Sequence, residues 1–131
     1  MSNNLKVAQS VIQHLAVQYG ISQGFLNDKG EPVKMFMGGA VIYISGPMSN
    51  HPNFNRGSFW LAEMALNRAG HATLSPAHWA SDQDYEVYMR ADFQMVLKAN
   101  TVFALKGWQD SKGAIAEITM AKSLNYTIFE E

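Results

Sequence analysis

The 131-residue sequence contains no cysteine, little charge and no long apolar run. Without cysteine, disulfide bonds, thiolate nucleophiles and thiolate metal sites are excluded. The four histidines show no metal-ligand spacing such as HxxxH, so we expect neither a metal nor an organic cofactor. No apolar run is long enough to cross a bilayer, and the N-terminus shows no signal-peptide pattern. A cytoplasmic protein without a membrane partner is therefore expected.

The charge of the sequence gives no indication of a charged macromolecular partner. The formal net charge is −1, and the ten Lys and Arg residues are scattered along the chain. A nucleic-acid-binding domain usually has a clustered basic face, so no nucleic acid polymer is expected as a partner. The hydrophobic content of 47% is that of an ordinary globular domain, and the length fits a single core.

Residues 1–39 differ in pattern from the rest and are expected to form an N-terminal extension. Apolar residues at three- and four-residue steps predict an amphipathic helix from about Asn3 to Tyr19, with Gly20 as its stop. The turn signal Asp28-Lys29-Gly30 predicts a hairpin or a loop over residues 24–33. Gly38-Gly39 then breaks the chain.

Residues 40–131 alternate between strand and helix patterns. The expected strands are 41–44, 72–74, 101–105 and 126–129. The expected helices run from Asn53 or Asn55 to about Ala69, then over 85–98 and 114–124. This alternation predicts an α/β three-layer sandwich around a parallel sheet of four to five strands. Because ligands bind at the carboxyl ends of such strands, residues 43–48, 75–79 and 105–113 are expected around one crevice.

Glu117 is the most informative position. It lies three residues after Ala114 and four before Ala121, on the helix face that should press against the sheet. In the first turn of that helix, an anion is favoured by the helix dipole. A partly desolvated, ionised carboxylate is the nucleophile that attack at a glycosidic carbon requires. A glutamate that merely caps the helix explains the position equally well.

Asp92 also falls on an apolar stripe of its helix. The apolar residues of that stripe are Met89, Phe93, Val96 and Leu97. A carboxylate there is costly unless it is paired or functional. Pairing with Arg90 or capping of a nearby loop is the ordinary explanation. The functional one is that Asp92 and Glu117 form the acid and nucleophile of retaining glycosyl transfer.

Two turns and several aromatic residues are candidate ligand contacts. A helix start offers free N–H groups to a phosphate or sugar hydroxyl, although Ser111 there is equally explained as an N-cap. Tyr43 could hydrogen-bond Glu117 or simply belong to the core. The turn residues are Ser45, Gly46, Pro47, Met48, Ser111, Gly113 and Ala114. The aromatic and histidine candidates, each also explicable by packing, are Phe54, Trp60, Trp79, Trp108 and His78.

Five segments carry a resemblance to a known family. They are Tyr43-Ile-Ser-Gly-Pro-Met48, residues 55–59, residues 70–76, Tyr88-Met-Arg-Ala-Asp92, and the element Gly107-Trp-x-x-Ser-x-Gly-Ala-x-x-Glu117. Together they resemble the nucleoside 2-deoxyribosyltransferase-like superfamily, most closely its small phage and prophage members. The resemblance covers about residues 41–129, and residues 1–39 have no recognisable counterpart in it.

The resemblance implies a flavodoxin-like (Rossmann-like) sheet and a double-displacement mechanism. By that match Glu117 is the nucleophile, Asp92 the acid/base and Tyr43 the residue that orients the glutamate. It also implies a small-molecule nucleoside or nucleotide ligand and a homo-oligomer, dimeric or larger. The transferases usually carry an aspartate at the position of Ser111. Relatives that hydrolyse nucleoside 5′-monophosphates have a serine there that contacts the phosphate, so hydrolysis is slightly favoured over transfer.

Three functions remain open at this point. The first is an N-glycosidase or transferase acting on a 2′-deoxynucleoside or its 5′-monophosphate. The second is a module on the same fold that binds a nucleotide or nucleotide-derived signal without turnover. The third is a protein-interaction role for the N-terminal helix. The base, the phosphate state and the choice between transfer and hydrolysis do not follow from the sequence.

Overall fold

Four parallel strands form one sheet in the order β2-β1-β3-β4. The strands are β1 Val41–Ser45, β2 Ala72–Leu74, β3 Thr101–Ala104 and β4 Thr127–Glu130. The structure is a computed structural model that describes residues 3–33 and 40–131. The predicted parallel sheet is confirmed, with four strands. The order reverses between β1 and β3, and at such a switch point the strand ends leave a crevice.

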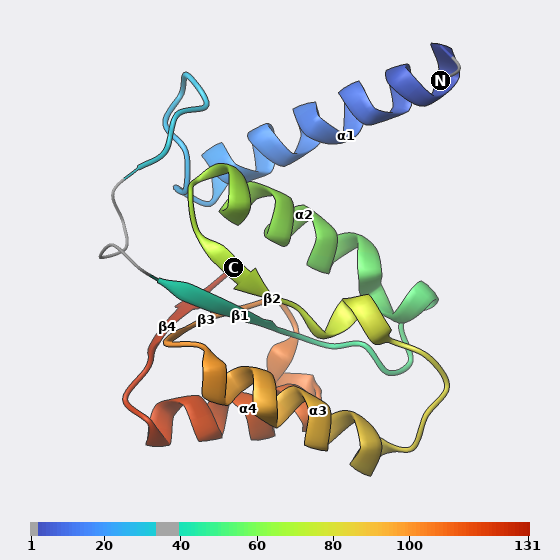
Figure 1. Ribbon diagram of the computed structural model, residues 1–131, viewed down its shortest axis with the longest axis vertical. Helices are drawn as coiled ribbons and strands as arrows, with labels where there is room; N and C mark the ends of the chain where they lie inside the picture. The colour runs from blue at the N-terminus through green and yellow to red at the C-terminus, as the bar shows by residue number, and fades with distance from the viewer. Residues whose placement is uncertain (1–2, 34–39) are drawn as a thin grey trace.

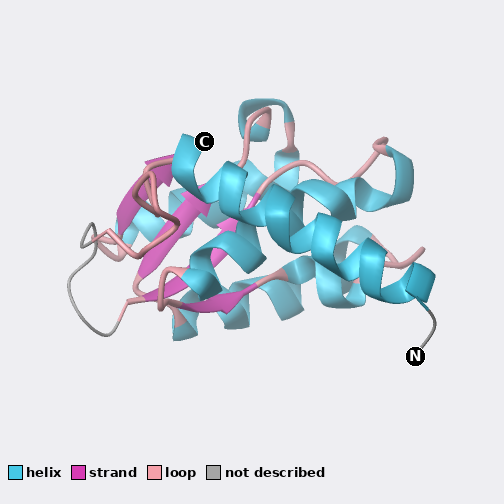
Figure 2. Cartoon of the chain, turned by 90° about the horizontal axis from the view of Figure 1, so that it is seen from above, coloured by secondary structure: helices cyan, strands magenta, loops and turns pink. Residues whose placement is uncertain are grey.

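Helices cover both faces of this sheet and complete the predicted sandwich. The helices are α1 Asn3–Ser22, α2 Arg56–Arg68, α3 Tyr85–Lys98 and α4 Lys112–Ser123, with short turns η1 Pro52–Asn55, η2 Pro76–Trp79 and η3 Trp108–Asp110. Figure 1 shows α1 and α2 on one face of the sheet and α3 and α4 on the other. Seen from above, α1 reaches well beyond the strands at its N-terminal end (Figure 2).

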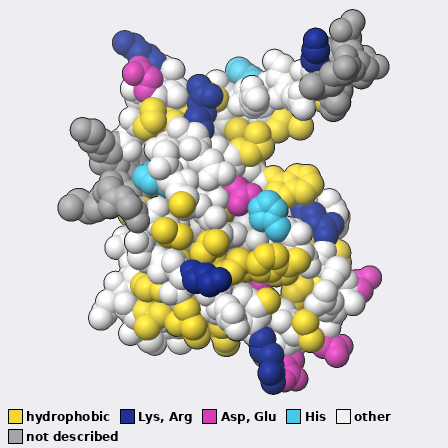
Figure 3. Space-filling view, viewed as in Figure 1, with side chains coloured by type: hydrophobic (Ala, Val, Ile, Leu, Met, Phe, Trp, Pro, Cys, Tyr) yellow, Lys and Arg dark blue, Asp and Glu magenta, His cyan; other side chains and the backbone are white. Residues whose placement is uncertain are grey.

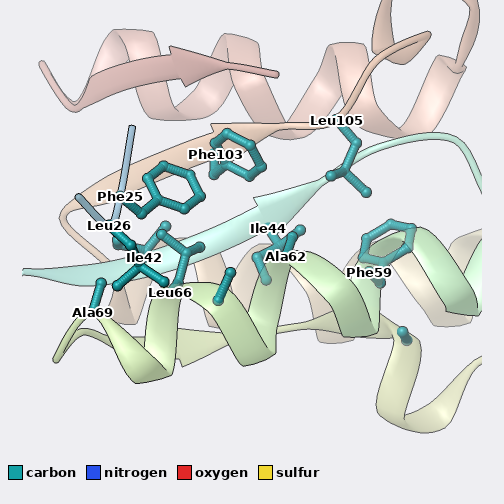
Figure 4. Packing of buried hydrophobic residues seen from close by; sticks show 12 residues of the cluster. Phe25, Leu26, Ile42, Ile44, Phe59, Ala62, Leu66, Ala69, Phe103 and Leu105 are labelled. Carbon is teal, nitrogen blue, oxygen red and sulfur yellow. The ribbon is translucent and has the colours of Figure 1, made fainter. Parts of the chain in front are cut away.

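The alternation of side chains along β1 divides the core in two. Ile42 and Ile44 pack toward α2, against residues that include Phe59 and Leu66 (Figure 4). Tyr43 points to the opposite face and packs with the apolar residues of α3 and α4. Because β1 is central and buried on both faces, its sequence is a continuous apolar run. The same alternation directs Ser45, two residues after Tyr43, toward α4.

The N-terminal extension departs from its predicted pattern at two points. The helix does not stop at Tyr19 but continues through Gly20 to Ser22. Gly20 allows close packing there, since a Cβ atom on it would lie 2.7 Å from Cδ1 of Leu26. Residues 24–33 form a turn with a single antiparallel bridge between Leu26 and Pro32. The expected break at 38–39 lies outside the described residues.

Among the side chains of α1 that the structure describes, the apolar ones are buried only near the C-terminal end of the helix. Ala16 packs in the core, whereas Val11, Ile12 and Leu15 are 46–53% exposed. Figure 3 shows this part of the molecule standing away from the body. On the same face, Lys and Arg side chains stand singly and form no basic patch.

Two smaller expectations on the helices were wrong. Leu97 of α3 is not buried with its stripe but is 59% exposed, and Met95 takes its place in the core. Helix α2 begins at Arg56, and neither Asn53 nor Asn55 caps it with a side chain. Asn55 instead uses its amide to donate a hydrogen bond to the Pro47 carbonyl, at 2.9 Å.

Candidate active site

A pocket of about 300 Å³ opens at the carboxyl ends of the central strands. Its walls come from the loop after β1, the segment after β2, and the facing sides of α3 and α4. Asp92 of α3 and Glu117 of α4 both line it, although each is at most 5% exposed. The pocket therefore ends on two deeply buried carboxyl groups.

Glu117 is held by a residue of the central strand. Its Oε1 atom accepts a hydrogen bond from the Ser45 hydroxyl at 2.8 Å. The helix begins at Lys112, two residues earlier than expected, so Glu117 lies in the second turn and not in the first. The side chain that caps the helix is Ser111, whose Oγ accepts from the Ala114 N–H at 3.2 Å. Capping therefore does not explain why Glu117 is buried.

Asp92 and Glu117 interact directly, and burial dominates their electrostatics. Burial raises the pKa of Glu117 well above its usual range, and the nearby charge of Asp92 raises it further. Burial also raises the pKa of Asp92, although hydrogen bonds from Glu117 and Trp79 oppose this. Two carboxyl groups in contact cannot both ionise easily, so their contact favours a state in which one of them keeps its proton.

Of the two ordinary explanations for Asp92, pairing with Arg90 does not apply, whereas a hydrogen bond does join Asp92 to Trp79 in the neighbouring turn η2. Arg90, the cation expected to neutralise it, forms an ion pair with Glu86 at 2.6 Å on the exposed side of α3. Among the described residues, no Lys or Arg forms a salt bridge with Asp92 or Glu117. The sequence therefore places two buried carboxyl groups side by side without a cation to balance them, which is typical of a functional site.

Tyr43 lies behind the pocket, beside the carboxyl pair. Its ring is fully buried between the sheet and the α3–α4 layer. Burial raises its pKa well above the usual value, and the charges of Glu117 and Asp92 raise it further. Its hydroxyl makes no well-aligned hydrogen bond with any described residue, yet it interacts with Glu117 and lowers the pKa of that carboxyl group. Ser45 donates the better-aligned bond to Glu117, and the orienting role of Tyr43 stays a prediction.

The other predicted contacts divide between the pocket and its surroundings. Those that line it are Gly46, Met48, Phe54, Ser111, Gly113 and Ala114. Ser45 lies behind Glu117, and Pro47 is buried next to the mouth. His78 is 2.7 Å from Glu63 on α2, and the Trp108 indole donates to Glu130 at 2.7 Å. Neither His78 nor Trp108 lines the pocket, because each side chain has a partner elsewhere.

One wall of the pocket was not predicted. It consists of the polar segment between η2 and α3 and the first turns of α3, namely Ala80, Ser81, Asp82, Gln83, Tyr85, Tyr88 and Met89. Only its position in the chain could have indicated this wall. The segment follows the end of β2 and therefore lies at the edge of the sheet where ligands bind. Its polar composition alone is indistinguishable from that of any surface loop.

The described residues hold neither a membrane-spanning helix nor a cluster of metal ligands. In residues 3–33 and 40–131, no helix is long and apolar enough to cross a membrane. Within the same ranges, no group of three or more His, Asp or Glu side chains is placed to hold a metal ion.

Comparison with known proteins places the chain in a family and supports its fold. Residues 40–130 match the family described as "Domain of unknown function (DUF4406)". No curated protein matches the chain. One similar solved structure is a 2-deoxyribosyltransferase from the psychrotolerant bacterium Bacillus psychrosaccharolyticus, described as a biocatalyst for the synthesis of nucleosides. It is 20% identical, with a TM-score of 0.54, and the similarity covers 70% of this chain and 71% of that chain. At that identity the similarity shows a shared fold.

Proposed function

We propose that this chain, which belongs to the DUF4406 family, acts on the N-glycosidic bond of a 2′-deoxynucleoside or its 5′-monophosphate. The observation that carries the proposal is the buried pair of Asp92 and Glu117 at the end of the pocket. Binding alone does not require two carboxyl groups in contact, because their mutual repulsion is unfavourable. Glycosyl transfer with retention uses two carboxyl groups about 5–5.5 Å apart as acid and nucleophile, so a bound sugar would have to part these two.

The proposed reaction has two displacements. A carboxylate oxygen of Glu117 attacks C1′ of the sugar while the bond to the base breaks, and the bonding electrons leave with the base nitrogen. The single proton of the pair passes from Asp92 to the departing base. Water then attacks C1′ and releases Glu117, giving hydrolysis, or a second base does so, giving transfer. In both cases Asp92 accepts the proton of the incoming group.

For this reaction the proton must lie on Asp92 when the ligand is bound. In the unliganded pocket the hydrogen bond between the carboxyl groups favours the proton on Glu117. The hydrogen bond from Ser45 stabilises the ionised form of Glu117 and opposes this preference. A sugar inserted between the two groups would separate them and remove the bond that holds the proton on Glu117.

Ser111 favours hydrolysis of a 5′-monophosphate over transfer between bases. Its Oγ lines the pocket and accepts from the helix, which leaves the hydroxyl proton available for a phosphate oxygen. The adjacent N–H groups at the start of α4 favour an anion in the same place. The resemblance of this segment to monophosphate hydrolases points the same way.

Product analysis tests the proposal directly. The protein is incubated with each common 2′-deoxynucleoside and each 5′-monophosphate, with and without a second free base, and the products are separated by chromatography. We expect free base from at least one substrate, and intact-protein mass spectrometry should detect a deoxyribosyl adduct. A new nucleoside in the mixtures would identify a transferase.

Two glutamate variants provide the controls. Glu117→Gln should abolish base release, because its amide cannot act as the nucleophile. Glu63→Gln is the matched control, since Glu63 is a partly buried glutamate that bonds Thr73 and His78 away from the pocket. Base release that survives in Glu117→Gln, or its absence from the unmodified protein with every substrate, would contradict the proposal.

A binding module without turnover is the second candidate. One observation favours it, namely that burial raises the pKa of Glu117, which disfavours the ionised form that a nucleophile needs. A neutral carboxyl group can donate as well as accept, which suits recognition of a base or sugar. Nucleotide binding that is measurable by calorimetry, without product formation, would support this alternative.

A further inference from the structure

The loop that forms the mouth of the pocket has an unusual backbone. Asn53, Phe54 and Asn55 are consecutive residues in the left-handed region, with φ of +50°, +55° and +59°. Asn50 is also left-handed, with φ of +65°. We call residues 50–55 the strap. Asparagine tolerates this conformation, but for a bulky residue such as Phe54 it is a genuine outlier. Conformations of this kind persist only where surrounding contacts hold them, and they cluster at functional sites.

Arg56 supplies the contacts that hold the strap. Its Nη1 atom donates to Oδ1 of Asn53 at 2.7 Å, and its guanidinium carbon lies 5.1 Å from the centre of the Phe54 ring. Its Nη2 atom donates to the carbonyl oxygen of Ala80. The strap follows β1, whereas Ala80 follows η2, so one side chain connects two walls of the pocket.

The geometry suits an arginine and no other residue. A planar guanidinium can donate in two directions within its plane while its face covers an aromatic ring. Within the described part of the chain, Arg56 contacts only neutral groups, so no carboxylate competes for it. Lysine carries the same charge but lacks the plane, and it cannot make the three contacts together.

Phe54 is the part of the strap that reaches the ligand space. Its side chain lines the pocket, as does Ala80 on the facing wall. Because Arg56 lies over one face of the ring, a stacked ligand must take the other face. A flat heteroaromatic ring stacked there would gain the offset contact that aromatic pairs favour.

We propose that Arg56 is a positioning residue that latches the strap to the facing wall and presents the Phe54 ring to the flat base of the ligand. The identity of that ligand as a nucleoside or nucleotide rests on the function proposed above. The contacts by which Arg56 holds the strap do not depend on that function. Without Arg56 the strap relaxes from its left-handed conformation, Phe54 leaves its place, and the pocket loses the surface that orients the base.

Hydrogen exchange tests the latch without any substrate. The amide of Phe54 donates to His51 O at 3.1 Å, and that of Arg56 donates to Asn53 O. In Arg56→Met we expect these amides to exchange about tenfold faster, the effect of losing one hydrogen bond from a charged donor. Arg68→Met is the matched control. Arg68 is also on α2 and also donates to a backbone carbonyl, that of Gly30, but away from the pocket.

Kinetics and chemical rescue then test the presentation of Phe54. On a substrate that the wild type cleaves, Arg56→Met should raise KM about tenfold and leave kcat within about threefold, because the carboxyl pair is untouched. Removing the side chain in Arg56→Ala or Phe54→Ala should also raise KM. Millimolar guanidinium should lower the raised KM part of the way back in Arg56→Ala but not in Phe54→Ala. A general loss of structure would lower kcat as well and would not respond to guanidinium.

Each outcome decides between the alternatives. Faster exchange confined to residues 47–56 and 79–84 in Arg56→Met, and absent in Arg68→Met, supports the latch. Unchanged exchange in the strap overturns it, whatever the kinetics. If Arg56→Met does not fold, hydrogen exchange in Arg56→Lys decides instead. Lysine keeps the charge and a single donor nitrogen but lacks the planar guanidinium. A wild type that cleaves no substrate contradicts the proposed function only, because the exchange result still judges the latch.

Discussion

Ser45 donates a hydrogen bond of 2.8 Å to Oε1 of Glu117, joining residues 72 positions apart in the chain. Both side chains are buried, and the bond connects the end of the central strand to the second turn of α4. It is a charge-assisted bond whenever Glu117 is ionised, and such bonds favour the ionised form. Ser45 therefore adjusts the acidity of Glu117, although it does not line the pocket.

Replacing Ser45 by alanine should shift the pH dependence of base release. The Ser45 bond lowers the pKa of Glu117, so its loss raises that pKa. Because the proposed attack needs ionised Glu117, the acid limb of the pH–kcat profile should move to higher pH by about one unit, the effect of one hydrogen bond. Ser75→Ala is the matched control, since Ser75 is buried and caps η2 without touching Glu117. An unshifted acid limb in Ser45→Ala would contradict this role.

The stability of the protein should depend on the protonation of Glu117. The folded-state pKa lies above the ordinary value of 4.5, so the fold favours the protonated group. The resulting stabilisation is complete below pH 4.5 and is lost as the pH rises through the folded pKa. Glu117→Gln resembles the protonated group at every pH. Its free energy of unfolding relative to wild type should therefore increase from pH 4.5 to 8, by about 1.4 kcal/mol for each unit of pKa elevation. Denaturant unfolding across this range measures it, and a constant difference would refute the prediction.

Asp92→Asn should slow base release in a way that depends on the leaving group. Loss of a general acid costs about 100- to 10,000-fold when the departing group needs a proton. The nitrophenolate released from a nitrophenyl 2-deoxyriboside is a stable anion and needs no proton in order to leave. We therefore expect a large loss of kcat with natural substrates and a much smaller loss with the nitrophenyl compound. Equal losses with both would show that Asp92 acts by another route.

Alanine substitutions at Gly46 and at Gly57 should change the stability of the protein in opposite directions. A Cβ atom on Gly46 would lie 2.7 Å from Cβ of Leu105, at the point where β1 enters the pocket loop. We expect Gly46→Ala to destabilise the protein by about 1–3 kcal/mol through overpacking. Gly57 lies in the first turn of α2 with nothing within 4 Å of the added atom. Gly57→Ala should stabilise by about 0.5–1 kcal/mol, because alanine favours the helix. Thermal unfolding of both variants tests the pair.

Most of the fold was predictable because local pattern and tertiary packing agree from residue 40 onward. The central strand is a β-branched apolar run bounded by turn residues, and α3 has the predicted bounds, Tyr85–Lys98. The boundary of α1 was wrong because a side chain from beyond the helix packs on it. Gly20 continues a helix because the side chain of Leu26 packs over it, and neither local propensity nor spacing reveals that contact.

The candidate site was predictable only in part. Helical spacing indicated that Asp92 and Glu117 face inward, since each interrupts an apolar stripe. Spacing did not reveal that Ser45 binds Glu117, because Tyr43 and Ser45 point to the same side of the strand and only the packed structure shows which of them is well aligned. Nor did it reveal that His78 and Trp108 turn to Glu63 and Glu130. Those partners belong to other elements of the fold.

The sequence by itself determined the alternation of strands and helices, the inward direction of the two carboxyl groups and the edge of the sheet at which they meet. These follow from periodicity and chain connectivity, which are local properties. Only the tertiary structure decided that Asp92 and Glu117 touch, that their burial raises both pKa values, and that Arg56 joins two walls of the pocket. Acidity, strain and pocket shape depend on which distant groups come into contact, and that is fixed by packing in three dimensions.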